Sequence, residues 1–308
     1  MQLRIKSATW EVPDIVSYEL RDPDGGELPP FTAGAHIDLT LPNGLIRSYS
    51  LINPQSERLR YVIAVQKDRA SRGGSKWVHE NFRVGDLVTI AGPRNNFALD
   101  ESARASLFIA GGIGITPILS MIARLSALGR PWELVYCART RAAAAFADTL
   151  QGNVRFNFDQ EPGGCLPDIA ALVAAAPPEA HLYCCGPLPM LAAFESATAH
   201  VPRERVHVEY FTAREPAAVE GGFKVVLAKS GREFVVPPGK TILDTLLEAG
   251  LDIPYSCTEG VCGTCETKVL EGIPDHRDLI LTEEERAAGK TMMICCSGAK
   301  TEKLVLDL

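Results

Sequence analysis

The sequence has no block of basic residues, no internal repeat and no uninterrupted apolar segment suited to crossing a membrane. With a formal net charge of −7, it is not the sequence of a nucleic-acid-binding protein. Its N-terminus lacks the apolar core and cleavage site of a signal peptide. Residues 105–123 carry no charge, but Gly111, Gly112, Gly114 and Pro117 divide them, which favours a strand, a turn and a buried helix. We therefore expect a cytoplasmic protein that contacts neither nucleic acid nor membrane.

The cysteines are too many and too unevenly placed for a disulfide framework. There are nine in 308 residues, an odd number, and five of them follow residue 256. Without a secretion signal, such a cluster favours a reduced metal or iron–sulfur site. The length suggests about two domains, and a hydrophobic content of 46% is sufficient for buried cores.

The first part of the chain has the pattern of an antiparallel barrel. Short alternating strands are separated by Gly- and Pro-rich turns up to about residue 102, and a short helix is expected after Gly73-Gly74-Ser75. From residue 103, apolar strands alternate with helix-like runs, which predicts a parallel sheet. The predicted helical runs are 117–128, 142–149, 169–175 and 189–198.

The last part of the chain begins after an Ala-, Glu- and Gly-rich linker, residues 213–222. Residues 223–227 and 233–236 are expected to form a hairpin, followed by an amphipathic helix over 241–249. The pattern Cys257-x4-Cys262-x2-Cys265, completed by Cys295, comes next. That spacing is typical of plant-type 2Fe-2S ferredoxins, in which four thiolates hold two irons.

Two alternatives accompany this interpretation. A zinc site normally needs paired C-x2-C units or His partners, and only one C-x2-C is present. The ferredoxin spacing selects Cys295 over Cys296 as the fourth ligand. Because successive side chains of an extended segment point to opposite faces, we expect Cys296 to face away as a buried thiol.

A flavin site is suggested by two short segments. Gly73-Gly74-Ser75 precedes a helix whose N-terminus can bind a phosphate, with Ser75 as a cap or contact. Within Arg47-Ser48-Tyr49-Ser50, Arg47 is suited to neutralise that phosphate, Tyr49 to lie along a flat ring, and Ser50 to bond a ring nitrogen. The competing interpretation is an ordinary barrel strand with Tyr49 in the core and Arg47 on the surface.

A nucleotide site is suggested by Gly111-Gly112-Ile113-Gly114-Ile115-Thr116-Pro117, which joins an apolar strand to a helix. The segment departs from the standard dinucleotide motif, so a tight strand–helix turn is an equal alternative. Cys184-Cys185-Gly186-Pro187 ends another strand, where ligands of parallel sheets bind. We expect Cys185 to face the same crevice, whereas Cys184 is readily explained as a buried thiol.

Over essentially its whole length, the chain resembles the phthalate dioxygenase reductase family of the ferredoxin-NADP reductase superfamily, which includes vanillate O-demethylase reductase-type proteins. The resemblance is carried, in order, by RSYSL, VIAVQKD, GGS, AGGIGITP, YCCGP, VHVEYF, SCTEGVCGTC, DHRD and LVLDL. It implies an FMN-binding β-barrel (1–102), an NAD(P)-binding α/β domain (103–216) and a β-grasp ferredoxin domain (217–308).

The resemblance also implies roles for residues. Ser50, Thr116 and Cys185 would be catalytic, with Glu209 near the flavin. The expected FMN contacts are Arg47, Ser48, Tyr49, Ser50, Ala64, Val65, Gly74, Ser75 and Phe211. The expected NAD contacts are Gly112, Gly114, Thr116, Pro117, Arg139, Cys185, Gly186 and Pro187. Gln66 and Ser48 stand where related sequences carry Lys and Thr.

The implied activity is that of an NADH-dependent reductase component. Hydride would pass from NADH to FMN, and single electrons through the 2Fe-2S cluster to a Rieske-type oxygenase; a monomer is expected. Arg139 and Arg141 suit an NADPH phosphate or a solvated helix start equally, and the resemblance favours NADH. The chain has no C-x-H paired with C-x2-H, so its own cluster is not of the Rieske type.

Two other functions use the same residues. A cytochrome P450 or another haem protein could be the electron acceptor, which the sequence does not distinguish. A non-enzymatic redox carrier or sensor would have a damaged nucleotide site, and the intact GGIGITP, CCGP and RSYS segments argue against it. The acidic excess after residue 223 suits a basic partner surface, or is simply an acidic surface.

Overall fold

The computed structural model describes residues 1–68 and 73–308. They form two compact units, Met1–Glu209 and Tyr210–Leu308. We describe each unit by itself.

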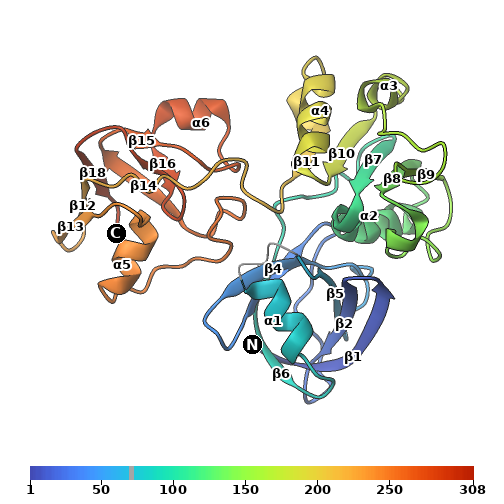
Figure 1. Ribbon diagram of the computed structural model, residues 1–308, viewed down its shortest axis with the longest axis horizontal. Coiled ribbons are helices and arrows are strands. Elements are labelled where there is room, and N and C mark those ends of the chain that lie inside the picture. The colour runs from blue at the N-terminus through green and yellow to red at the C-terminus, as the bar shows by residue number, and fades with distance from the viewer. Residues whose placement is uncertain (69–72) are drawn as a thin grey trace. The chain divides into compact units, whose positions relative to one another are not determined.

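The first unit begins with a six-stranded antiparallel sheet in the order β4-β3-β6-β1-β2-β5. A bridge between Leu51 and Ile63 connects its two edges, so that the sheet closes into the expected barrel (Figure 1). Tyr61, Ile37 and Leu39 are among the side chains that fill it. The elements are β1 (Gln2–Val12), β2 (Ile15–Arg21), β3 (His36–Thr40), β4 (Ile46–Ser50), β5 (Tyr61–Gln66), α1 (Gly74–Asn81) and β6 (Leu87–Arg94).

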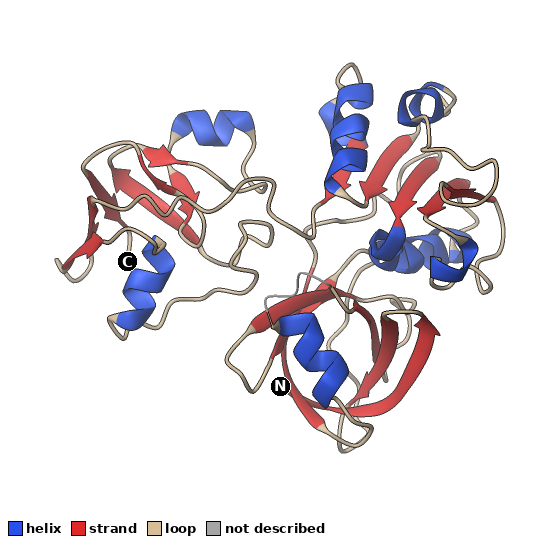
Figure 2. Ribbon diagram, in the orientation of Figure 1, coloured by secondary structure: helices blue, strands red, loops and turns tan. Residues whose placement is uncertain are grey.

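A parallel five-stranded sheet in the order β11-β10-β7-β8-β9 completes the first unit. Figure 2 shows helices flanking this sheet, and the alternation confirms the predicted α/β architecture. The elements are β7 (Ser106–Gly111), η1 (Gly112–Gly114), α2 (Ile115–Ala127), β8 (Trp132–Ala138), η2 (Arg141–Ala143), β9 (Val154–Phe158), α3 (Ile169–Ala174), β10 (His181–Cys185), α4 (Leu188–Thr198), η3 (Arg203–Arg205) and β11 (Val206–Glu209).

The predicted helix over residues 142–149 is wrong. Only a short 3-10 turn, η2, forms there, and Phe146 has a left-handed backbone with φ 64° that no α-helix contains. Ala145 is fully buried and packs in a cluster with Val12, Ile15 and Ala64 of the barrel. Small alanines therefore serve close packing between the barrel and the parallel sheet, and this tertiary contact overrides their helix propensity.

The second unit is a mixed sheet in the order β13-β12-β18-β14-β16, with a separate two-stranded sheet, β15-β17. The predicted hairpin and helix are present, and Thr241 caps the helix through a capping box. Cys265, Cys295 and Cys296 belong to its apolar core. The elements are β12 (Phe223–Leu227), β13 (Glu233–Val236), α5 (Ile242–Glu248), β14 (Glu266–Glu271), β15 (Pro274–Asp275), α6 (Glu283–Ala288), β16 (Thr291–Met293), β17 (Gly298–Ala299) and β18 (Lys303–Leu306).

Among the helices in the described part of the chain, none is both long and apolar enough to span a membrane. The uncharged stretch 105–123 divides at its glycines into β7, η1 and the first part of α2, as the sequence predicts. The barrel and the α/β part lie in one unit, and the domain boundaries at 102 and 216 stay predictions.

Candidate functional site

The four predicted cluster ligands come together in the second unit. Cys262, Cys265 and Cys295 are buried, and Cys257 is partly exposed. The loop aims polar groups at their sulfurs: the Glu259 N–H donates to Cys257 Sγ at 3.3 Å, and the Cys257 N–H donates to Cys262 Sγ at 3.5 Å. Such N–H groups stabilise thiolates and the negative charge of an iron–sulfur cluster.

The four sulfurs lie in a connected row, from Cys262 through Cys257 and Cys295 to Cys265. The thiols of Cys262 and then Cys295 lower the pKa of Cys257, and the thiol of Cys295 lowers the pKa of Cys265. Within residues 1–68 and 73–308, no three His, Cys, Asp or Glu side chains are grouped where a single ion could bind. Four thiols gathered in this way suit a cluster of two irons.

Cys296 does not face away from the ligand loop as expected. Residues 294–296 form a turn rather than an extended segment, with the N–H groups of Cys296 and Ser297 both donating to Met293 O. The strand alternation on which the expectation rested is therefore absent. Cys296 is buried as predicted, and a Cβ on Gly260 would lie 2.5 Å from its Sγ. Its thiol thus packs directly beneath the loop that joins Cys257 to Cys262.

The predicted phosphate-binding residues of the first unit also meet. A Cβ on Gly74 would lie 2.5 Å from Arg47 Nε and 2.8 Å from Arg47 Cγ, so the Arg47 side chain crosses the start of α1. The first turn of α1 contains no acidic residue. Free N–H groups of a helix start beside a guanidinium group form a site suited to a phosphate. Ser75, in the same turn, accepts a hydrogen bond from the Asp68 N–H at 3.1 Å.

The remaining residues predicted to contact the flavin divide between the two faces of β4. Tyr49 lies on the Arg47 face and packs against the barrel core, where burial raises its pKa to about 12. Ser48 lies on the other face and donates to Asp38 Oδ1 at 2.7 Å. Its hydroxyl is therefore already used within the barrel wall, and its contact to a flavin stays a prediction.

Strand β5 is tied to helix α1 beside this site. His79 Nε2 donates to the carbonyl oxygen of Val65 at 2.9 Å. Ala64, Val65 and Ser50 are buried. The structure thus brings the predicted flavin-binding segments of β4, β5 and α1 together. Phe211 belongs to the second unit and is 39% exposed, and its contact to the flavin stays a prediction.

The glycine segment after β7 serves two purposes. A Cβ on Gly114 would lie 2.2 Å from Cys185 O, and one on Gly111 would lie 2.6 Å from Pro187 Cδ. These two glycines let the ends of β7 and β10 approach each other, which supports the tight-turn interpretation. Gly112 differs: its φ is +55° and nothing lies within 4 Å of its Cβ position, so it borders open space.

The neighbouring nucleotide-site residues are held by this packing. The Thr116 hydroxyl donates to Ile113 O at 2.9 Å, and Thr116 and Pro117 are buried in the first turn of α2. A Cβ added to Gly186 would lie only 2.8 Å from Met190 Sδ, so this position also needs glycine. Pro187 is the N-cap residue of α4. Thr116 and Gly186 therefore have structural roles that are independent of any ligand.

Cys185 and Glu209 end two adjacent parallel strands and are paired in register. Cys185 is 1% exposed, and burial raises its pKa well above the usual value. Burial also raises the pKa of Glu209 to about 8. A protonated thiol and a carboxyl group that can hold a proton near neutrality thus lie at the carboxyl edge of the sheet, where ligands bind.

The two arginines after β8 have different surroundings. Arg139 is exposed. Arg141 forms an ion pair with Asp148 at 2.6 Å and lies over the ring of Phe156. Arg141 thus has a surface partner that water screens, and Arg139 is the other exposed cation available to a nucleotide.

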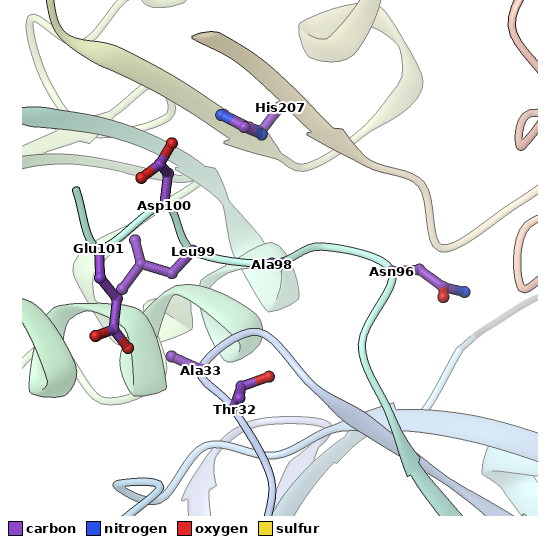
Figure 3. Close-up of a pocket in the computed structure, with 8 residues that line it drawn as sticks. All are labelled: Thr32, Ala33, Asn96, Ala98, Leu99, Asp100, Glu101 and His207. Atoms are coloured by element: carbon purple, nitrogen blue, oxygen red, sulfur yellow. The ribbon is translucent and has the colours of Figure 1, made fainter. Parts of the chain in front are cut away.

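A separate pocket of about 720 Å³ in the first unit contains none of the predicted site residues (Figure 3). His207 forms one wall, where its ring stacks on Tyr183 with centroids 4.2 Å apart and its Nε2 lies 3.1 Å from His181 Nδ1. Burial, and then His181, lower the pKa of His207 to about 4. The lining residues are Thr32, Ala33, Asn96, Ala98, Leu99, Asp100, Glu101 and His207.

Sequence reasoning missed a polar group beside the cysteine loop. His276 and Asp278 of the DHRD segment are buried next to Arg286 of α6. In the sequence, DHRD contributes only to the family resemblance. An Asp side chain often accepts hydrogen bonds from the backbone N–H groups two and three residues after it in a turn. That tendency is the local signal that could have identified Asp278.

Comparison with known proteins identifies the domain that contains the cysteine loop. Residues 225–300 match the family of 2Fe-2S iron-sulfur cluster binding domains. The beta subunit of phenoxybenzoate dioxygenase from Ectopseudomonas oleovorans is 56% identical over 311 residues, covering 100% of this chain and 97% of that protein.

Two solved structures match the whole chain. Phthalate dioxygenase reductase, described as a modular structure for electron transfer from pyridine nucleotides to a 2Fe-2S centre, is 41% identical with a TM-score of 0.79, covering 100% of this chain and 98% of that one. An intact type IV self-sufficient cytochrome P450 monooxygenase is 41% identical with a TM-score of 0.86. The chain covers only 41% of that longer protein.

Proposed function

Because this chain belongs to the phthalate dioxygenase reductase family, we propose that it is the reductase component of a two-component oxygenase system of the Rieske type. It would take hydride from NADH, hold FMN in the barrel, and deliver single electrons through a 2Fe-2S centre to the oxygenase. The observation that carries the proposal is the gathering of Cys257, Cys262, Cys265 and Cys295 around one loop, within the segment 225–300 that matches 2Fe-2S cluster binding domains.

When bound, the flavin and the cluster supply the conversion from two-electron hydride chemistry to one-electron transfer. The residues of the chain would position these groups and the nucleotide. Arg47 and the N-terminus of α1 would hold the FMN phosphate, since they form the cationic site of the barrel. Tyr49 would cover one side of the ring system, because it lies on the same face of β4 as Arg47.

At the carboxyl edge of the parallel sheet, Gly112 leaves open space for the nucleotide, whereas Gly114 and Thr116 keep the turn in place. Cys185 would exclude water from the nicotinamide position, because its thiol is buried and stays protonated. Glu209, next to it in register, would hold a proton near neutral pH. NADH is preferred to NADPH in this proposal on the family resemblance, and the exposed Arg139 is the cation that could instead favour NADPH.

The test is to purify the full chain, release and identify the flavin, and measure iron, acid-labile sulfide and the visible spectrum. We expect FMN, two irons and two sulfides per chain. Kinetics with NADH and NADPH should then show a lower KM for NADH. Recovery of FAD, or a protein without iron and sulfide after anaerobic reconstitution, would contradict the proposal.

A second acceptor is favoured by one comparison, since the chain also matches part of a self-sufficient cytochrome P450. Electron delivery to a purified Rieske oxygenase and to a P450 haem domain can be compared in the same NADH oxidation assay. Faster transfer to the haem domain would replace the Rieske partner in the proposal. Failure of NADH to reduce cytochrome c through the protein would instead favour a redox carrier without turnover.

A further inference from the structure

The DHRD segment places two of its four polar side chains inside the second unit. Asp275 and Arg277 pair with each other and are partly exposed, with Arg277 Nη2 2.8 Å from Asp275 Oδ2. His276 and Asp278 alternate with them, and their side chains are 9% and 0% exposed. The buried half of this segment is polar in a region that is otherwise an apolar core.

Asp278 organises the turn that follows it. Its Oδ2 accepts the N–H of Ile280 at 3.1 Å and the N–H of Leu281 at 2.8 Å. Its Oδ1 is buried without a hydrogen-bond partner in the described structure, and His276 Nδ1 lies 3.6 Å away. The carboxylate is thus fixed in position while only half of its hydrogen-bonding capacity is met.

Arg286, on α6, is the cation next to this carboxylate. Its Nη2 donates to the backbone carbonyl of Asp278 and lies 3.8 Å from Asp278 Oδ2. The Arg286 side chain is 35% exposed, so water screens its charge, whereas the Asp278 side chain is fully buried. The two charges therefore do not cancel inside the protein, and the carboxylate has the stronger local effect.

The Asp278 turn is in direct contact with the cysteine loop. The Leu279 N–H donates to Gly260 O at 2.9 Å, and a Cβ on Gly260 would lie 2.9 Å from Asp278 Cα. Gly260 lies between Cys257 and Cys262. Asp278 therefore lies against the loop whose thiols would hold the cluster, with its own Cβ 3.2 Å from the same position on Gly260.

From this placement we propose that Asp278 and Arg286 are positioning residues that set the reduction potential of the 2Fe-2S cluster with opposite signs; the inference rests on the proposed function. Reduction adds one negative charge to the cluster. A fixed carboxylate beside the loop opposes that charge, and the guanidinium group favours it. Asp278 thus lowers the potential and Arg286 raises it.

The experiment is a redox titration of the full chain, followed by the EPR signal of the reduced cluster. Asp278→Asn removes the charge but keeps an oxygen that can accept the two N–H groups, and should move the potential to a more positive value. Arg286→Gln should move it to a more negative value, and Arg286→Lys should restore the wild-type value. The matched control is Glu284→Gln on the exposed side of α6, which makes the same charge change as Asp278→Asn in solvent.

Opposite shifts for Asp278→Asn and Arg286→Gln, both larger than that of Glu284→Gln, would support the proposal. Shifts of the same sign would show that loop distortion is responsible, and a shift of Asp278→Asn no larger than the control would also overturn it. If Asp278→Asn does not retain the cluster, the two Arg286 variants decide. A more negative potential for Arg286→Gln together with the wild-type potential for Arg286→Lys would support the proposal, and any other result would overturn it. Wild-type protein without iron and sulfide would instead contradict the proposed function.

Discussion

Replacing Gly74 by Ala should weaken FMN binding without weakening the fold. The new Cβ would lie 2.5 Å from Arg47 Nε, so the Arg47 side chain must leave the start of α1. The atoms in the way, Arg47 Nε, Cγ and Cδ, all belong to one flexible side chain, and Ala is a better helix former than Gly. The substitution therefore removes a phosphate contact while leaving the stability of α1 unchanged or slightly increased.

The size of the effect follows from the contact that is lost. A hydrogen bond to a charged group contributes about 1.5–3 kcal/mol. Losing it should raise the Kd for FMN roughly 10- to 150-fold, since 1.4 kcal/mol is a factor of ten. Arg47→Ala should have the same effect, and the double variant should be no weaker than either single one, because both changes remove one interaction.

The assay is quenching of flavin fluorescence on titration into protein freed of its flavin. Riboflavin is the matched control ligand, because it has the ring system but no phosphate, and its Kd should not change. Thermal unfolding of the flavin-free protein checks that the fold is intact. The reasoning is refuted if Gly74→Ala binds FMN as the wild type does, or if it weakens riboflavin binding equally.

Three further results are expected. Cys295→Ser should lose the cluster and Cys296→Ser should keep it, as measured by iron and sulfide content; the reverse would overturn the ligand assignment. Because the pKa of His207 is about 4 in the fold and that of free His is near 6.5, this side chain should cost stability as pH falls from 6.5 to 4, on the order of 3 kcal/mol. Urea unfolding of His207→Gln should show a smaller acid loss in that window, and an unchanged pH profile would contradict the assigned burial. Gly114→Ala should lower the thermal midpoint by several degrees, because overpacking against Cys185 O costs about 1–3 kcal/mol; an unchanged midpoint would show that the two strand ends need not be so close.

The cysteine loop and the phosphate site could be recognised from the sequence because their chemistry is local. Cys257, Cys262 and Cys265 occur within one loop, so their spacing along the chain is close to their spacing in space. Arg47 and Gly74 are farther apart in sequence. Their meeting could be predicted because a glycine-led helix start needs a nearby cation to hold a phosphate.

Other features depend on packing that local patterns do not contain. The alternation rule failed at Cys295 and Cys296 because a turn, closed by Met293 O, replaces the strand. The alanine-rich run near Ala145 failed as a helix because close contact with the barrel decides its backbone. Asp278 is buried by contacts with the cysteine loop, His276 and Arg286, and nothing in the four letters DHRD indicates which side chains point inward.

Cys265, Cys295 and Cys296 share an apolar core with Met293 and Ile294, which has a consequence for maturation of the protein. We expect loading of iron and sulfide to be coupled to completion of that core, since metal binding at such a site contributes directly to folding. When iron is limiting during expression, we therefore expect a protease to cut the chain mainly after Tyr210. The Met1–Glu209 unit should survive this digestion.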